Sequence, residues 1–97
     1  MVHNLRRIDW GRTVGGADWA ERFDAAAREL MEQRPADVPQ LRTHPDHDLA
    51  VPTPDHFQPL LYVSGIAAAT GEPVTTFNAG CQMGSLSMTS YAVGLAA

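Results

Sequence analysis

The sequence predicts one domain of the α/β class, in which helices pack against a small sheet. Two stretches have the spacing of helices, residues 18–33 and 58–69, and two have the composition of strands, residues 74–78 and 85–91. The 97 residues contain 44% hydrophobic and 19% charged side chains, which is typical of a globular chain and not of a disordered or fibrous one. We therefore expect residues 1–97 to form a single domain, or part of one, with a modest core.

The first 17 residues are predicted to form a strand end followed by an irregular loop. Residues 1–8 begin apolar and become polar, and Asn4 is a residue type that favours turns. Glycines at positions 11, 15 and 16 keep the following segment irregular, but their spacing is not that of a glycine-rich phosphate loop. This segment therefore gives no indication of a nucleotide site.

The next element is predicted to be an amphipathic helix. Asp18 can cap it, and it runs to about Gln33, because Pro35 pushes the preceding residue out of the helical region. Apolar residues recur at steps of three and four along one face, at Trp19, Phe23, Ala26, Ala27, Leu30 and Met31.

A long connection is predicted between residues 35 and 54. This segment contains five prolines and little periodicity, so only a short helical piece is expected, around Val38 to Arg42. Connections of this length inside a compact domain are uncommon and are frequently functional.

A second helix follows, with apolar residues on most sides, and we expect it to be buried. Thr53 and Pro54 have the types of an N-cap and a first-turn residue. A proline deep inside a helix costs about 3 kcal/mol, so Pro59 places the regular helix from about Gln58 to Ala69, with His56 in the preceding turn.

The C-terminal part is predicted to contain two strands. Residues 74–78 form the first, and residues 85–91 form the second, in which hydroxyl-bearing and apolar side chains alternate. The glycine-bounded segment between them, "AGCQMG", is predicted to be a turn.

Charge and cysteine content exclude several classes of function. The net charge of −4 provides no basic surface for nucleic acid or for an anionic membrane, and no apolar stretch is long enough to span a bilayer. The single cysteine, Cys81, cannot form an internal disulfide, which is typical of a reducing compartment. We therefore expect a cytoplasmic location, with neither nucleic acid nor a membrane as a partner.

Two histidines are the main candidates for chemistry. His56 lies in a proline-fixed turn, where a rigid imidazole suits a metal ligand or a general acid, but a turn histidine bonded to the backbone fits the same pattern. His3 lies at a predicted strand end, where α/β enzymes place functional groups, but such a histidine is often structural or exposed.

The other candidates have weaker patterns. His44 and His47 lie near two aspartates, but zinc sites need three or four separated ligands, so a solvated loop is the preferred interpretation. A buried or incidental thiol is preferred to a nucleophile at Cys81. The hydroxyls of the last strand are expected to face solvent or backbone, at Ser85, Ser87, Thr89 and Ser90.

Three stretches together resemble a known family. They are "MVHNLRRIDW", "VPTPDHFQPLLYVSGIA" and "GSLSMTSY", and they are similar to the C-terminal part of class III extradiol ring-cleaving dioxygenases of the DOPA 4,5-dioxygenase-like branch. This resemblance implies an αβα sandwich around a central mixed sheet. It also implies an Fe(II) or Zn(II) cofactor, and a catechol-type small molecule and O₂ as the reactants.

The resemblance also implies roles for three residues. His56 matches the metal-ligand histidine of the family's proline-flanked motif, and Asp55 before it would orient the imidazole. His3 matches the histidine of the "HNLR" motif, which would take the catechol proton and return it.

The chain departs from the family in length. Family members are much longer, and their other metal-binding histidines lie in an N-terminal half that these residues do not include. We therefore expect a truncated catalytic domain, or one completed by a partner, with exposed apolar surface and self-association as a homo-oligomer. The alternative is a non-catalytic remnant or a small oligomerising interaction module, and the sequence leaves open whether the chain alone is an enzyme.

Overall fold

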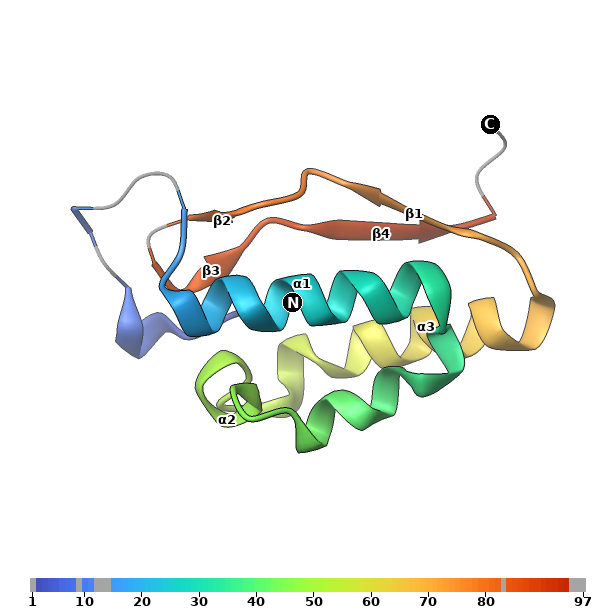
Figure 1. Ribbon diagram of the computed structural model, residues 1–97, viewed down its shortest axis with the longest axis horizontal. Helices are drawn as coiled ribbons and strands as arrows, with labels where there is room; N and C mark the ends of the chain where they lie inside the picture. Colours follow the sequence, from blue (N-terminus) through green and yellow to red (C-terminus); the bar gives the residue numbers. More distant parts are fainter. Residues whose placement is uncertain (1, 9, 12–14, 83, 95–97) are drawn as a thin grey trace.

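The strands and the helices form two layers in the computed structural model (Figure 1). The structure describes residues 2–8, 10–11, 15–82 and 84–94. Helices α1, α2 and α3 lie on one side of the strands, and both long helices contact them. The prediction of a mixed helix and strand fold is confirmed. The described residues do not include a second helical layer, so the third layer of a sandwich stays a prediction.

Helix α1, Asp18–Gln33, covers the predicted residues, but its N-cap and part of its buried face differ from the prediction. Asp18 is its first residue and not its cap, since the N-cap is Ala17 and makes no side-chain hydrogen bond. The buried stripe includes a carboxylate and runs through Ala20, Phe23, Asp24, Ala27 and Met31. Trp19, Ala26 and Leu30 are only partly buried, at the margin of this stripe.

The connection after α1 is more ordered than predicted. It contains the 3₁₀ helix η2, Pro35–Thr43, the short helix α2, His47–Ala50, and the 3₁₀ turn η3, Pro54–His56. The predicted helical piece lies inside η2, where Val38 and Leu41 are buried. Residues three apart lie on the same side of a 3₁₀ helix, so this spacing places both side chains in the core.

Helix α3, Gln58–Thr70, begins where Pro59 predicted and ends at Gly71, whose φ of 70° is left-handed. The prediction that it is buried is wrong for much of its surface. Leu60, Ser64 and Ala67 are buried, whereas Tyr62 is 75% exposed and Ile66 is 56% exposed. The exposed apolar surface that we expected therefore lies on this helix.

The strands form two short antiparallel pairs. Strand β1, Val74–Phe77, pairs with β4, Ser90–Val93, and β2, Cys81–Gln82, pairs with β3, Leu86–Ser87. The predicted strand 85–91 is therefore divided, and the predicted turn contains β2. Positive φ angles at Asn78 (51°) and Gly80 (140°) interrupt the regular pairing on the β1–β2 side.

The N-terminal segment runs beside β3, which agrees with the strand end predicted there. His3 forms an isolated bridge with Leu86, and the backbone N–H of Ser87 donates to Val2 O at 2.8 Å. Asn4 forms the predicted turn, because its side chain accepts a hydrogen bond from Arg6 N and caps the 3₁₀ turn η1, Leu5–Arg7. Val2 is buried, so this segment belongs to the core.

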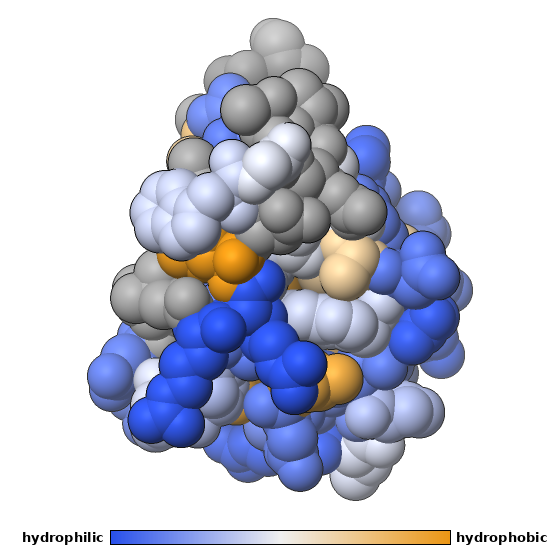
Figure 2. Space-filling model, turned by 90° about the vertical axis from the view of Figure 1, so that its left-hand side faces the viewer, coloured by the Kyte–Doolittle hydropathy of each residue, from blue (hydrophilic) through white to orange (hydrophobic). Residues whose placement is uncertain are grey.

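Seen from the end that carries β2 and β3, the described surface is mainly hydrophilic, with apolar residues in small separate areas (Figure 2). Within the described ranges, no helix has the length and apolar composition needed to cross a membrane.

Candidate functional site

A pocket of about 220 Å³ lies where the N-terminal segment, the first turns of α3 and the β3–β4 segment meet. It is mostly apolar, and His3 lies in its wall. The other lining residues are Val2, Pro59, Leu60, Val63, Ser87, Thr89, Ser90 and Tyr91. Concave, mostly apolar sites with a few polar groups are typical of small-molecule binding.

The backbone holds His3 at this pocket from two sides. Its N–H donates to Ala50 O at 2.9 Å, at the end of α2, and it pairs with Leu86 of β3 on the other side. The residue is partly buried. The structure therefore brings His3 to the pocket, while its proposed role in proton transfer stays a prediction.

His56 lies in the turn that leads into α3. It is the last residue of η3, the N–H of Phe57 donates to Pro54 O at 3.0 Å, and α3 begins directly afterwards. Pro59, three residues later, lines the pocket. The side chain of His56 lies outside the described part of the structure, so the predicted convergence of the two imidazoles stays a prediction.

Two predictions about this turn have different outcomes. Thr53 precedes η3 at the N-cap position, but its side chain makes no capping hydrogen bond. Asp55 is exposed in the turn. Its expected role in orienting the His56 ring stays a prediction, because that ring is not described.

A buried carboxylate holds two of the pocket hydroxyls. Ser87 Oγ donates to Asp24 Oδ1 at 2.5 Å, and Thr89 Oγ1 donates to Asp24 Oδ2 at 2.8 Å. Asp24 is 8% exposed. The prediction that these hydroxyls face solvent or backbone is therefore wrong for Ser87 and Thr89, although it holds for Ser85, whose Oγ donates to Asn4 O.

Sequence reasoning missed Asp24, although its spacing contained a signal. Asp24 lies at steps of four and three from Ala20 and Ala27, so it shares the core face of α1. A carboxylate on such a face needs hydrogen-bond donors, because burying it without partners is costly. Serine and threonine in a later strand are suitable donors, as Ser87 and Thr89 are here.

Tyr91 also lines this pocket, and its hydroxyl group is buried. Its Oη is buried and has no hydrogen-bond partner among the described residues. Burial raises the pKa of Tyr91 well above its usual range, and the negative charge of Asp24 adds to the effect. Tyr91 therefore stays a neutral phenol at physiological pH and does not act as a base.

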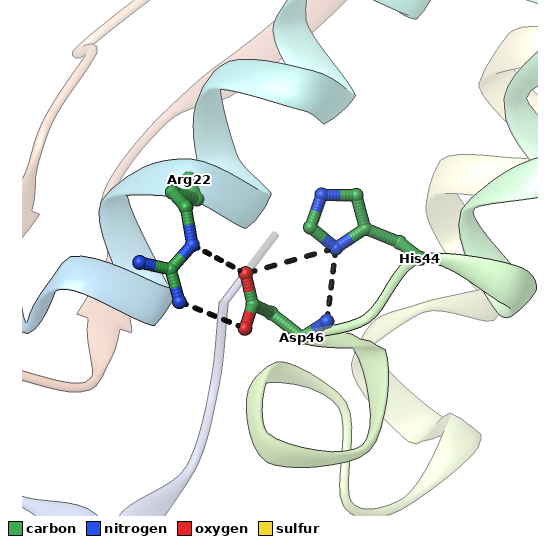
Figure 3. A network of polar contacts seen from close by, with 3 residues as sticks. All are labelled: Arg22, His44 and Asp46. Carbon is green, nitrogen blue, oxygen red and sulfur yellow. Dashed lines mark hydrogen bonds and ion pairs between the residues drawn. The ribbon is translucent and has the colours of Figure 1, made fainter.

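The other two histidines belong to a packed network and not to a solvated loop, and Figure 3 shows one of them, His44, beside Arg22 and Asp46. The His44 ring meets Phe23 edge-on with centroids 5.3 Å apart, and the His47 ring meets Phe57 in the same way at 5.5 Å. The imidazoles are 22% and 19% exposed. The interpretation as a solvated loop is therefore wrong, because the rings are part of the edge of the core.

Arg22 and Asp46 complete this network. The guanidinium donates through Nε at 2.8 Å and Nη2 at 3.0 Å to the two carboxylate oxygens of Asp46. The N–H of Asp46 donates to His44 Nδ1 at 3.0 Å, so this nitrogen presents its lone pair. Its contact of 3.9 Å with Asp46 Oδ2 is too long for a hydrogen bond.

Cys81 is a buried thiol, as predicted. It is 3% exposed, and burial raises its pKa to about 12, with further increases from the charges of Asp24 and Glu21. Because the thiolate is the nucleophilic form, this residue is not an activated nucleophile. Gly16 packs so closely against it that an added Cβ would lie 2.7 Å from Cys81 Cβ.

The described side chains do not fit a complete metal site. Among them, no group of three or more His, Cys, Asp or Glu residues is arranged to hold a metal ion. Sites for Fe(II) or Zn(II) need at least three protein ligands. Any such site would therefore need ligands beyond the described side chains.

Comparison with known proteins gives two likenesses, and no family model matches the chain. The chain is 40% identical over 98 aligned positions to a protein of Escherichia coli K12 named 4,5-DOPA dioxygenase extradiol. This alignment includes 97% of the chain but 36% of the relative, so the chain spans about a third of the length of the curated relative that it matches.

The fold also has a counterpart among solved structures. The crystal structure of an uncharacterized protein from Escherichia coli K12 superimposes with a TM-score of 0.75 at 38% sequence identity. The match covers 93% of this chain and 38% of that protein. Nearly all of the chain is therefore similar, in sequence and in fold, to one part of longer proteins.

Proposed function

We propose that this chain provides the His3 pocket of a metal-dependent extradiol dioxygenase of class III, which opens a catechol ring with O₂. The observation that carries the proposal is the 40% identity, over 97% of the chain, to a protein named as an extradiol DOPA dioxygenase. The position of His3 in the wall of a pocket supports it. In this proposal the chain corresponds to the C-terminal part of the enzyme and of its αβα sandwich.

The pocket has the size and character that a catechol ring needs. A dry apolar cavity of about 150 Å³ accepts benzene, and this pocket has a volume of about 220 Å³. Leu60 and Val63 supply apolar contacts for the ring, and His3 is a titratable group beside them. In the proposed reaction His3 takes a proton from a catechol hydroxyl and later returns it.

The proposed metal is Fe(II) or Zn(II), with His56 as one ligand and Asp55 orienting its ring. A bound metal would supply open coordination positions for the catechol and O₂, as in other non-haem oxygenases. Because the described side chains do not build such a site, the further ligands in this proposal lie outside the described part of the chain. We propose the cytoplasm as the location, since the single cysteine is typical of a reducing compartment.

A chimeric enzyme tests this proposal. The matching third of the Escherichia coli relative is replaced by these 97 residues, and bound iron and zinc, O₂ uptake and ring cleavage are measured with L-DOPA and simpler catechols. We expect the chimera to be active, His56→Ala to lose both metal and turnover, and His3→Gln to keep the metal but lose turnover. The matched control is His44→Ala, which removes a histidine that packs on Phe23 and does not line the pocket.

The variants have outcomes that contradict the proposal separately. Metal content and ring cleavage that survive in His56→Ala would remove the ligand assignment. Full turnover in His3→Gln would remove the proton-transfer role. A folded chimera with neither metal nor activity would favour the second candidate function.

The second candidate is a small oligomerising interaction module. It is favoured by the exposed apolar side chains of α3, Tyr62 and Ile66, because exposed apolar surface often marks an association site. Light scattering after size-exclusion chromatography should then give at least twice the mass of 10.5 kDa. A monomer for the wild type, unchanged in a Tyr62→Ser, Ile66→Ser variant, would exclude this function.

A further inference from the structure

We propose that the phenol hydroxyl of Tyr91 donates a hydrogen bond to a ring oxygen of the ligand in the pocket. The inference rests on the proposed function, because it assigns a binding partner to an oxygen of the catechol-type ligand. The hydroxyl groups around the pocket use their protons in different ways, and Tyr91 is the exception among those described.

The serine and threonine hydroxyls around the pocket already donate within the protein. Ser87 Oγ and Thr89 Oγ1 donate to the two oxygens of Asp24, at 2.5 and 2.8 Å. Ser90 Oγ donates to Met88 O at 3.1 Å. A hydroxyl has one proton to donate. In this arrangement, therefore, these three hydroxyls have no proton left for a ligand.

The Tyr91 hydroxyl differs because it is buried and has no hydrogen-bond partner in the described part of the chain. Burying a polar group without a hydrogen bond costs free energy, and phenylalanine would fill nearly the same volume without that cost. Buried polar groups without a partner are uncommon in native proteins, so each of them calls for an explanation. A ligand that supplies the missing acceptor provides one, since Tyr91 lines the pocket.

The phenol keeps the proton that it would donate. Burial raises the pKa of Tyr91 well above its usual range, and the charges of Asp24 and Glu32 raise it further. A ring oxygen that has lost its own proton to His3 is the stronger acceptor, because hydrogen bonds to an ionised group are stronger than neutral ones. The bond from Tyr91 therefore favours the singly ionised catechol over the neutral one.

The position of Tyr91 places it beside the apolar part of the pocket. It lies on β4 opposite Thr76 of β1, is partly buried, and packs against the core. Leu60 and Val63 of α3 line the same pocket and provide the contacts for the ring. Because the Tyr91 oxygen is closed off from solvent in the free chain, its side chain has to rotate toward the ligand for the bond to form.

Tyr91→Phe tests the inference in the 97-residue chain, with neither metal nor turnover. The variant should raise the urea midpoint of the free chain, because it removes an unpaired buried hydroxyl. It should also weaken the binding of 4-methylcatechol at least about fivefold, because the ligand oxygen loses its donor. Toluene has the same ring and methyl group but no oxygen, so it should bind equally to the wild type and the variant. Titrations followed by nuclear magnetic resonance measure both affinities.

Tyr62→Phe is the matched control. It makes the same chemical change on the exposed side of α3, where Tyr62 is 75% exposed and does not line the pocket. It should leave the urea midpoint and both affinities unchanged. A general effect on folding would weaken both ligands, whereas the loss of a direct bond to the ligand oxygen weakens 4-methylcatechol alone.

Failure of the inference and failure of the proposed function are distinguishable. A lower urea midpoint in Tyr91→Phe would show that the hydroxyl is paired in the free chain, and would overturn the inference. Equal affinities of the wild type and Tyr91→Phe for 4-methylcatechol would also overturn it, while leaving the catechol pocket intact. Weakened binding in this variant together with an inactive chimera would support the inference and count against the proposed function. Absence of 4-methylcatechol binding to the wild type would overturn both.

Discussion

Two aspartates connect α1 to other parts of the molecule, and their partners differ. Asp24, on α1, accepts hydrogen bonds from the hydroxyls of Ser87 and Thr89. Asp46, in the loop before α2, accepts two from the Arg22 guanidinium. The two residues are similarly buried, at 8% and 7% exposure.

The difference in partners separates a network that stabilises a loop from a carboxylate that lies beneath the pocket. Arg22 neutralises Asp46 in a bidentate pair, and the nearby imidazoles pack on aromatic rings, so the loop network is closed. Asp24 accepts hydrogen bonds from Ser87 and Thr89, two hydroxyl side chains that line the pocket. Whether its partners line the pocket or stabilise a loop therefore separates the two aspartates as guides to function.

The largest effect on stability is expected where the loop network, formed by Arg22, His44, Asp46 and His47, meets the core. Phe23 is fully buried and contacts the rings of both His44 and His47. Phe23→Ala should lower the free energy of unfolding by about 3–5 kcal/mol, because it removes a large buried side chain and leaves a cavity. Urea denaturation measures the loss, and ring proton shifts of the two histidines should move toward those of exposed imidazoles.

Phe23→Leu provides a milder comparison if the alanine variant does not fold. It keeps most of the volume but removes the aromatic face, so it should cost less while still shifting the histidine ring protons. Unchanged histidine shifts in both variants would contradict the packed arrangement of the loop.

A smaller effect is expected beneath the pocket. Asp24→Ala should cost about 1–3 kcal/mol, because the Ser87 and Thr89 hydroxyls lose the acceptor to which they donate. In a double-mutant cycle with Ser87→Ala the two changes should be non-additive by at least about 0.5 kcal/mol. Asp48→Ala is the surface control, and full additivity at Asp24 and Ser87 would contradict the proposed network.

Much of the fold could be predicted from local sequence. Proline and glycine signals fixed the ends of the two long helices, since Pro35 and Gly71 act on the backbone of their immediate neighbours. Apolar periodicity also identified Phe23, Ala27 and Met31 as core residues of α1. These effects act between residues that are close together in the chain, so they can be predicted from a single sequence.

The remainder depends on contacts between distant residues. The burial of α3 was overestimated, because its apolar composition does not specify whether a second layer covers Tyr62 and Ile66. The role of Asp24 depends on residues more than 60 positions away. The prediction of His3 as a functional residue began from its place at a predicted strand end, but a structural histidine fits the same pattern, so the family resemblance was needed to choose between them.

The smallest expected effect is on the pH dependence of stability, through Asp46 in the loop network. The hydrogen bonds from Arg22 hold the pKa of Asp46 below its ordinary value, with a further contribution from the Arg22 charge. The folded state therefore binds the proton at this carboxyl more weakly than the unfolded state. The stabilisation is complete above the ordinary carboxyl pKa of about 3.9 and is lost as the pH falls through the lower, folded value.

Asp46→Asn should accordingly make stability less steeply dependent on pH in this acidic range. Urea midpoints of the wild type and the variant, measured between about pH 6 and pH 2.5, should converge as the pH falls. Arg22→Gln should reproduce the shallower slope, because it removes the same pair from the other side. Asp48→Asn removes a carboxyl that is not paired with Arg22. Its urea midpoint should therefore depend on pH as steeply as that of the wild type. Parallel curves for Asp46→Asn and the wild type would show that the Arg22 pair does not stabilise the loop, and the contrast with Asp24 would then rest on the pocket alone.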